Sequence, residues 1–146
     1  MTERSYRDRM WQLWRILSSE LCQSKLRSKS PDIHPSEDRR GNYLITAGER
    51  VIVKPGDPPS GIVFNDGSFL VIYEKWSKTP DKLLGYRYHY QRRDDWFARY
   101  DMRETEMEGI PKHHLQASAL GEGVRLPTGE VKCEDILEMI VDQFVA

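Results

Sequence analysis

The sequence has little cysteine and no long apolar run. Its two cysteines, Cys22 and Cys133, lie too far apart to form a clustered zinc motif, and two residues make no disulfide framework. No stretch approaches the roughly 18 consecutive apolar residues that span a bilayer. The N-terminus also lacks the apolar segment of a secretion signal. We therefore expect a soluble, cytoplasmic protein with reduced thiols.

The chain also lacks an excess of charge of either sign. It carries 22 Lys and Arg residues against 23 Asp and Glu residues, so its formal net charge is −1. This balance provides no long-range attraction to nucleic acid, so a site for a polyanion must come from a local arrangement of side chains. The length of 146 residues fits one domain with a modest core.

Apolar periodicity predicts a helix near each end of the chain. Residues 2–28 carry apolar side chains at steps of three and four, which places on one stripe Tyr6, Met10, Leu13, Trp14, Leu17 and Leu21. Arginines flank the stripe at positions Arg4, Arg7, Arg9 and Arg15. This helix either docks on the domain, which we favour, or contacts a partner or nucleic acid. Residues 133–144 have a compact apolar face and form the second predicted helix.

Strand patterns fill the region between the helices. Polar residues and breakers make 29–42 a predicted linker or loop. Alternating patterns then predict strands at 43–46, 50–54, 61–64, 68–75, 84–91 and 96–101. Asn65-Asp66-Gly67 is the strongest hairpin turn signal. We predict an α+β fold in which residues 43–146 form an antiparallel sheet of about five to seven strands, with an N-terminal and a C-terminal helix.

The hairpin at 84–101 carries two rows of side chains on each strand. Alternation places Tyr86, Tyr88 and Tyr90 on one face, and Arg87, His89 and Gln91 on the other. The second strand separates Trp96, Ala98 and Tyr100 from Phe97, Arg99 and Asp101 in the same way. If both aromatic rows are buried, one register sets His89 opposite Arg99, Arg87 opposite Asp101 and Gln91 opposite Phe97. A slip by one residue would bury Arg99 and Asp101, which is costly.

This polar face has the residue types needed for chemistry on a phosphodiester. Histidine exchanges protons near neutral pH, arginine binds phosphate through its planar fork, and aspartate orients either one. The candidate catalytic residues are His89, Arg99, Asp101, His113 and His114, and the candidate phosphate- or substrate-binding residues are Arg87, Gln91 and Lys112. Adjacent strand residues point to opposite faces, so only one of His113 and His114 can join this face. The alternative is an ordinary solvent-facing sheet surface with a cross-strand Arg–Asp pair. We expect no metal, because too few ligands lie near His89 in the sequence, and no other cofactor.

Four short motifs together resemble the TumE family of toxin–antitoxin proteins. They are Tyr88-His89-Tyr90-Gln91, Phe97-Ala98-Arg99-Tyr100-Asp101, Pro111-Lys112-His113-His114 and Glu134-Asp135-Ile136-Leu137. The resemblance covers roughly residues 61–144. It implies a small intracellular toxin of a two-gene module, neutralised by a partner antitoxin and acting on RNA. The chain departs from the family pattern at Met102, at the loop histidines and at Lys132, where the family has other residues.

Two hypotheses follow for the function. The first is a toxin that acts on RNA through the polar face of the hairpin. The second is a non-enzymatic interaction module or accessory protein that binds a protein partner through the tyrosine-rich hairpin and the N-terminal helix. Exposed tyrosines would favour the second hypothesis, and buried tyrosines would weaken it. The sequence is compatible with a homo-oligomer under either hypothesis.

Overall fold

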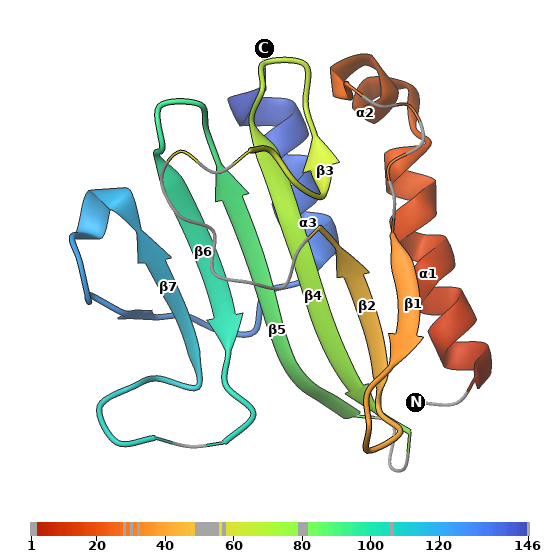
Figure 1. The fold of residues 1–146 in the computed structure, drawn as a ribbon, viewed down its shortest axis with the longest axis vertical. Coiled ribbons are helices and arrows are strands. Elements are labelled where there is room, and N and C mark those ends of the chain that lie inside the picture. Colours follow the sequence, from red (N-terminus) through yellow and green to blue (C-terminus); the bar gives the residue numbers. More distant parts are fainter. Residues whose placement is uncertain are drawn as a thin grey trace.

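The computed structural model describes residues 3–27, 29, 31, 33–48, 56, 58–78, 82–105 and 107–145. These residues form an α+β fold with an eight-stranded sheet, in which every pair of neighbouring strands is antiparallel (Figure 1). The strand order is β1-β2-β4-β5-β6-β7-β8, and β3 pairs with β4. The predicted fold class is therefore confirmed.

The helices and strands have the following bounds. The helices are α1 (Glu3–Leu17), α2 (Glu20–Lys25) and α3 (Cys133–Met139), and α3 continues into a π-helical turn at Ile140–Phe144. The strands are β1 (His34–Glu37), β2 (Tyr43–Ala47), β3 (Ile62–Val63), β4 (Phe69–Ser77), β5 (Lys82–Gln91), β6 (Phe97–Met102), β7 (His113–Ala117) and β8 (Leu126–Pro127). The predicted strand at 50–54 lies outside the described residues.

The N-terminal helix is two helices rather than one. The chain leaves α1 after Leu17, and Ser19 begins α2 by accepting a hydrogen bond from the Cys22 backbone N–H. Serine favours this capping role over a helix interior, because its side chain replaces a missing backbone acceptor. The break ends the predicted apolar stripe, so Leu17 is buried whereas Leu21 is 51% exposed.

The strands at the two ends of this order, β1 and β8, are short, and each contains a proline. Strand β1 lies inside the segment 29–42 that the sequence predicts as a linker or loop, and Pro35 lies within it. Strand β8 ends at Pro127 on the opposite edge. Proline cannot donate a backbone hydrogen bond, so it is found in edge strands and avoided in central ones.

The core lies between one face of the sheet and the helices α1 and α3. In Figure 1, α3 lies behind the central strands and α1 runs along the edge formed by β1. Tyr86, Tyr88 and Tyr90 point into this core and are almost completely buried. Leu13 of α1 and Leu137 of α3 belong to the same apolar cluster. The tyrosine row of the hairpin is therefore core, and its burial removes it as an exposed binding surface.

A buried ion pair joins α1 to the sheet within this core. Glu74 of β4 is 0% exposed and accepts hydrogen bonds from Arg9 Nε (3.0 Å) and Arg9 Nη2 (2.6 Å). The Tyr88 hydroxyl (2.7 Å) and the Trp76 indole N–H (2.9 Å) donate to the same carboxylate. Arg9 also pairs with Glu134 of α3. Burial alone would lower the pKa of Arg9, but its bonds and attraction to the two glutamates outweigh burial and raise it.

Candidate functional site

Strands β5 and β6 pair in the register that the alternation of their side chains predicts. Arg87 lies opposite Asp101, His89 opposite Arg99 and Gln91 opposite Phe97. The physical reason is the one used for the prediction: this register buries the tyrosines against the helices and leaves the charged side chains on the other face. Strand β7 then pairs with β6 and adds His114 opposite Asp101.

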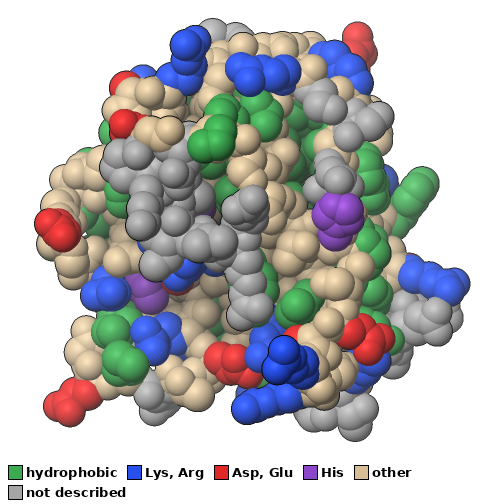
Figure 2. Space-filling model, in the orientation of Figure 1, with side chains coloured by type: hydrophobic (Ala, Val, Ile, Leu, Met, Phe, Trp, Pro, Cys, Tyr) green, Lys and Arg blue, Asp and Glu red, His purple; other side chains and the backbone are tan. Residues whose placement is uncertain are grey.

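We call these residues the polar cluster, which comprises Arg87, His89, Gln91, Arg99, Asp101 and His114. They come from three neighbouring strands and share the face of the sheet opposite α1 and α3. On this face, a histidine and several Lys and Arg side chains gather over the region of β6 and β7 (Figure 2). His89 is only 1% exposed, and Gln91, Asp101 and His114 are also buried. The cluster is therefore not an ordinary solvent-facing sheet surface.

Both ring nitrogens of His89 are occupied by neighbours. Arg99 Nε donates to His89 Nδ1 (3.0 Å), and His89 Nε2 lies 2.8 Å from Gln91 Oε1. Because Nδ1 accepts, the proton of the neutral ring is on Nε2 and is donated to Gln91. Burial lowers the pKa of His89 to about 4, and the charges of Arg99 and Arg87 act in the same direction. His89 is thus a neutral side chain that holds Arg99 in place.

Arg99 uses only its inner nitrogen within the cluster. Its Nε is bound to His89, and its guanidinium carbon lies 5.5 Å from the centre of the Phe97 ring. No carboxylate of the described residues forms an ion pair with its terminal nitrogens, and Asp101 pairs with Arg87 instead. Burial lowers the pKa of Arg99, and Arg87 lowers it further. A positively charged fork in this environment is suited to bind an anion.

Asp101 lies between an arginine and a histidine. Arg87 Nε donates to Asp101 Oδ1 (2.7 Å), and His114 Nε2 lies 3.6 Å from Asp101 Oδ2. His114 Nδ1 donates to the Pro111 carbonyl (2.9 Å), which fixes the orientation of the ring. Asp101 therefore holds Arg87 by a hydrogen bond and lies beside the second ring nitrogen of His114.

The structure separates the other sequence candidates from this cluster. His113 points to the core side, where its Nδ1 lies 2.9 Å from the Tyr86 hydroxyl, and burial lowers its pKa. Lys112 precedes β7 and is exposed. The sequence analysis did not include Gln116, which lies opposite Arg99 on β7. Gln116 is two residues from His114 in the sequence, and this spacing would have indicated that both side chains lie on the face of the polar cluster.

No group of three or more His, Cys, Asp or Glu residues in the described part of the chain is arranged to hold a metal ion. Among the same residues, no helix is long and apolar enough to cross a membrane. The side chains of the polar cluster that suit acid–base or phosphate chemistry are its arginines, histidines and aspartate. These side chains can bind a phosphate group and move a proton.

A comparison with protein-family models matches residues 42–144 to the family described as toxin TumE. The chain belongs to the TumE toxin family. The match includes every strand from β2 to β8 and the whole polar cluster, and it begins earlier than the motifs that carried the resemblance. Helices α1 and α2 lie outside it, although α1 contributes to the core. No curated protein and no solved structure matches the chain.

Membership of the TumE family suggests the toxin of a toxin–antitoxin system and implies an antitoxin partner in general. The family name gives no substrate and no reaction. These have to be argued from the side chains of the site.

Proposed function

We propose that this TumE-family protein is a cytoplasmic toxin that binds and cleaves a phosphodiester bond of RNA at the polar cluster. The observation that carries the proposal is the state of Arg99. Its Nε is held by His89, and its terminal nitrogens have no carboxylate partner among the described residues. An arginine held in this way presents its fork to a phosphate without first having to break an ion pair.

The contacts suggest a distinct role for each residue. Arg99 and Arg87 bind the phosphate, and Asp101 holds Arg87 and His114 in position. His114 is the candidate acid or base, because one ring nitrogen is fixed by Pro111 and the other lies on the side of Asp101. His89 and Gln91 are positioning residues, since both nitrogens of His89 are already bound. His113 and Lys112 are secondary candidates, because they lie outside the cluster.

Inducible expression with Arg99→Gln and His114→Gln tests this proposal. We expect the unchanged protein to arrest growth and to fragment cellular RNA, and each variant to lose this activity by a factor of about 10² or more. Arg92→Gln is the matched control for Arg99, because Arg92 is exposed in the turn of the same hairpin, where it pairs with Asp94 and lies 5.6 Å from the centre of the Trp96 ring. His113→Gln shows which of the adjacent histidines acts.

Circular dichroism of the purified variants must first show that each one is folded. Growth arrest by folded Arg99→Gln at the level of the unchanged protein would contradict the proposal. Growth arrest without any change in cellular RNA would support a toxin and would exclude RNA as its target.

Protein interaction is the second candidate function, and it is supported by a different part of the molecule. The buried tyrosines do not support a binding surface on the hairpin, but Trp11 of α1 is 67% exposed. It borders a groove of about 590 Å³ whose lining also includes Trp14, Pro35 and Tyr43. Trp11→Ala leaves growth arrest unchanged if the toxin acts only through the polar cluster, and it abolishes arrest if this helix carries the function.

A further inference from the structure

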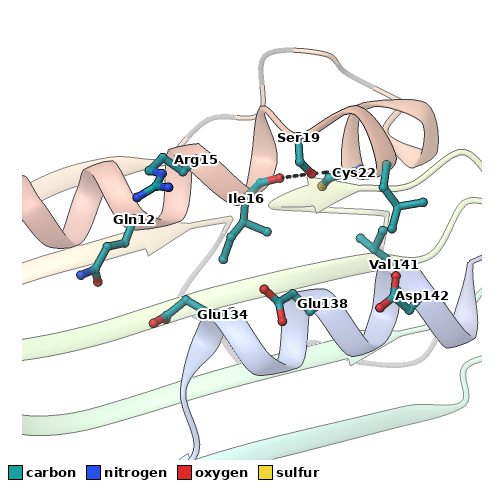
Figure 3. A pocket seen from close by; sticks show the side chains of 10 residues that line it. Gln12, Arg15, Ile16, Ser19, Cys22, Glu134, Glu138, Val141 and Asp142 are labelled. Carbon is teal, nitrogen blue, oxygen red and sulfur yellow. Dashed lines mark hydrogen bonds between the residues drawn. The ribbon is translucent and has the colours of Figure 1, made fainter.

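A second groove, of about 600 Å³, lies between α1, α2 and the C-terminal helix (Figure 3). It is on the helical side of the sheet, whereas the polar cluster lies on the other side. Its floor is apolar, and it is formed by Ile16, Cys22 and Val141. Leu21 lines the groove and is 51% exposed. Apolar surface of this kind is stabilised when another apolar surface covers it.

One wall of this groove carries negative charge. Glu134, Glu138 and Asp142 follow one another at steps of four along the C-terminal helix and line the groove together (Figure 3). Among the described residues, Glu134 is bound by Arg9, but Glu138 and Asp142 form no ion pair. Among the described residues that line the groove, Arg15 is the one cationic side chain. Three carboxylates therefore face one guanidinium, and two of the three are unpaired within the described part of the chain.

We propose that this groove docks a basic amphipathic helix of a protein partner. Such a helix places apolar side chains along one stripe and Lys or Arg at steps of four beside it. The apolar stripe covers Ile16, Val141 and Leu21, and the basic side chains pair with Glu138 and Asp142. The wall and the floor thus select the same partner by charge and by apolar burial.

The antitoxin that family membership implies is the partner this site would serve. The inference does not depend on RNA cleavage, because the groove and the polar cluster occupy opposite sides of the sheet. A variant can therefore lose docking while growth arrest is unchanged, or lose growth arrest while docking is unchanged. The first result concerns the groove, and the second concerns the polar cluster.

Binding of designed peptides to the full-length protein tests the proposal. The probe is a fluorescent peptide of about 18 residues, which is long enough to form a helix, with a leucine stripe and two lysines four positions apart. A second peptide has glutamate in place of both lysines. Fluorescence anisotropy gives the Kd of each peptide at low salt for the unchanged protein, for Glu138→Gln/Asp142→Asn and for Asp135→Asn. Asp135 is the matched control because it is exposed on the same helix but does not line the groove.

We expect the lysine peptide to bind at least about tenfold more tightly than the glutamate peptide. The double variant should lose about three- to tenfold in affinity for the lysine peptide, the range for two exposed charge pairs, and Asp135→Asn should lose none. Leu21→Asp should weaken both peptides. Equal affinity for the two peptides, no binding, or an equal loss from Asp135→Asn would overturn the proposal. A concentration-dependent dimer in sedimentation that Leu21→Asp abolishes would also overturn it, because a second copy would then be the occupant.

Discussion

Replacing Arg9 with methionine should remove a large part of the stability of the fold. Arg9 donates two hydrogen bonds to Glu74, whose carboxylate has no exposed surface. Methionine retains much of the apolar length of the side chain but leaves this charge with only the neutral donors Tyr88 and Trp76. Burial raises the pKa of Tyr88 well above its usual value, and so does the nearby Glu74 charge. The proton therefore stays on the Tyr88 oxygen and does not neutralise the Glu74 carboxylate.

The expected loss is about 3–5 kcal/mol, the cost of removing one partner from a buried ion pair. Small domains are stable by about 5–15 kcal/mol in total, so a loss of this size is a large part of the free energy of unfolding. The free energy of unfolding comes from urea titration followed by circular dichroism, which reports on α1 and α3 directly.

The matched control is Arg15→Met, because Arg15 is an exposed arginine on the same helix. It should change the unfolding free energy by no more than about 0.5 kcal/mol. Arg9→Met combined with Glu74→Leu should recover part of the loss, since both buried charges are then gone. If Arg9→Met unfolds at the same urea concentration as Arg15→Met, the ion pair does not anchor α1 and the reasoning is refuted.

Two further predictions concern a pKa and a turn. The pKa of His89 is lowered to about 4 by burial, so the stability that its neutral form contributes is complete above about pH 6.5 and is lost as the pH falls toward 4. Urea titrations should show that the unchanged protein loses more unfolding free energy between pH 7 and pH 4.5 than His89→Gln does, with a difference of up to about 3 kcal/mol. An equal loss in the two proteins would contradict the lowered pKa of His89. Gly61→Ala should destabilise the fold by about 1–3 kcal/mol, because Gly61 has φ +81° and an added Cβ would meet the Leu70 carbonyl oxygen. Gly129→Ala, where nothing lies within 4 Å of an added Cβ, is its control in the same thermal unfolding measurement.

The hairpin register could be predicted from the sequence because burial depends on alternation. Three tyrosines at steps of two fix which face of β5 enters the core, and Trp96 and Tyr100, which are partly buried, pack against the same core. The same rule predicts that only one of the adjacent histidines reaches the polar face, and the structure shows that it is His114. The C-terminal helix could also be predicted, since its apolar face has helical spacing.

The sequence could not predict elements that lack such a pattern. Strand β1 has no buried residue and contains Pro35, so its polar sequence is typical of a loop. The break before Ser19 interrupts a stripe that continues in the sequence to Leu21. The burial of His89 and Asp101 was also beyond prediction, because alternation separates two faces but does not say whether the second face is covered.

The prolines in β1 and β8 bear on how this TumE-family protein can associate with other chains. An incoming strand would find an incomplete row of backbone donors beside Pro35 and only a very short strand beside Pro127. We therefore expect that copies of the protein do not add strand to strand at β1 or β8. An association of this protein would then form between side chains on a face of the molecule, where we expect single substitutions to weaken it.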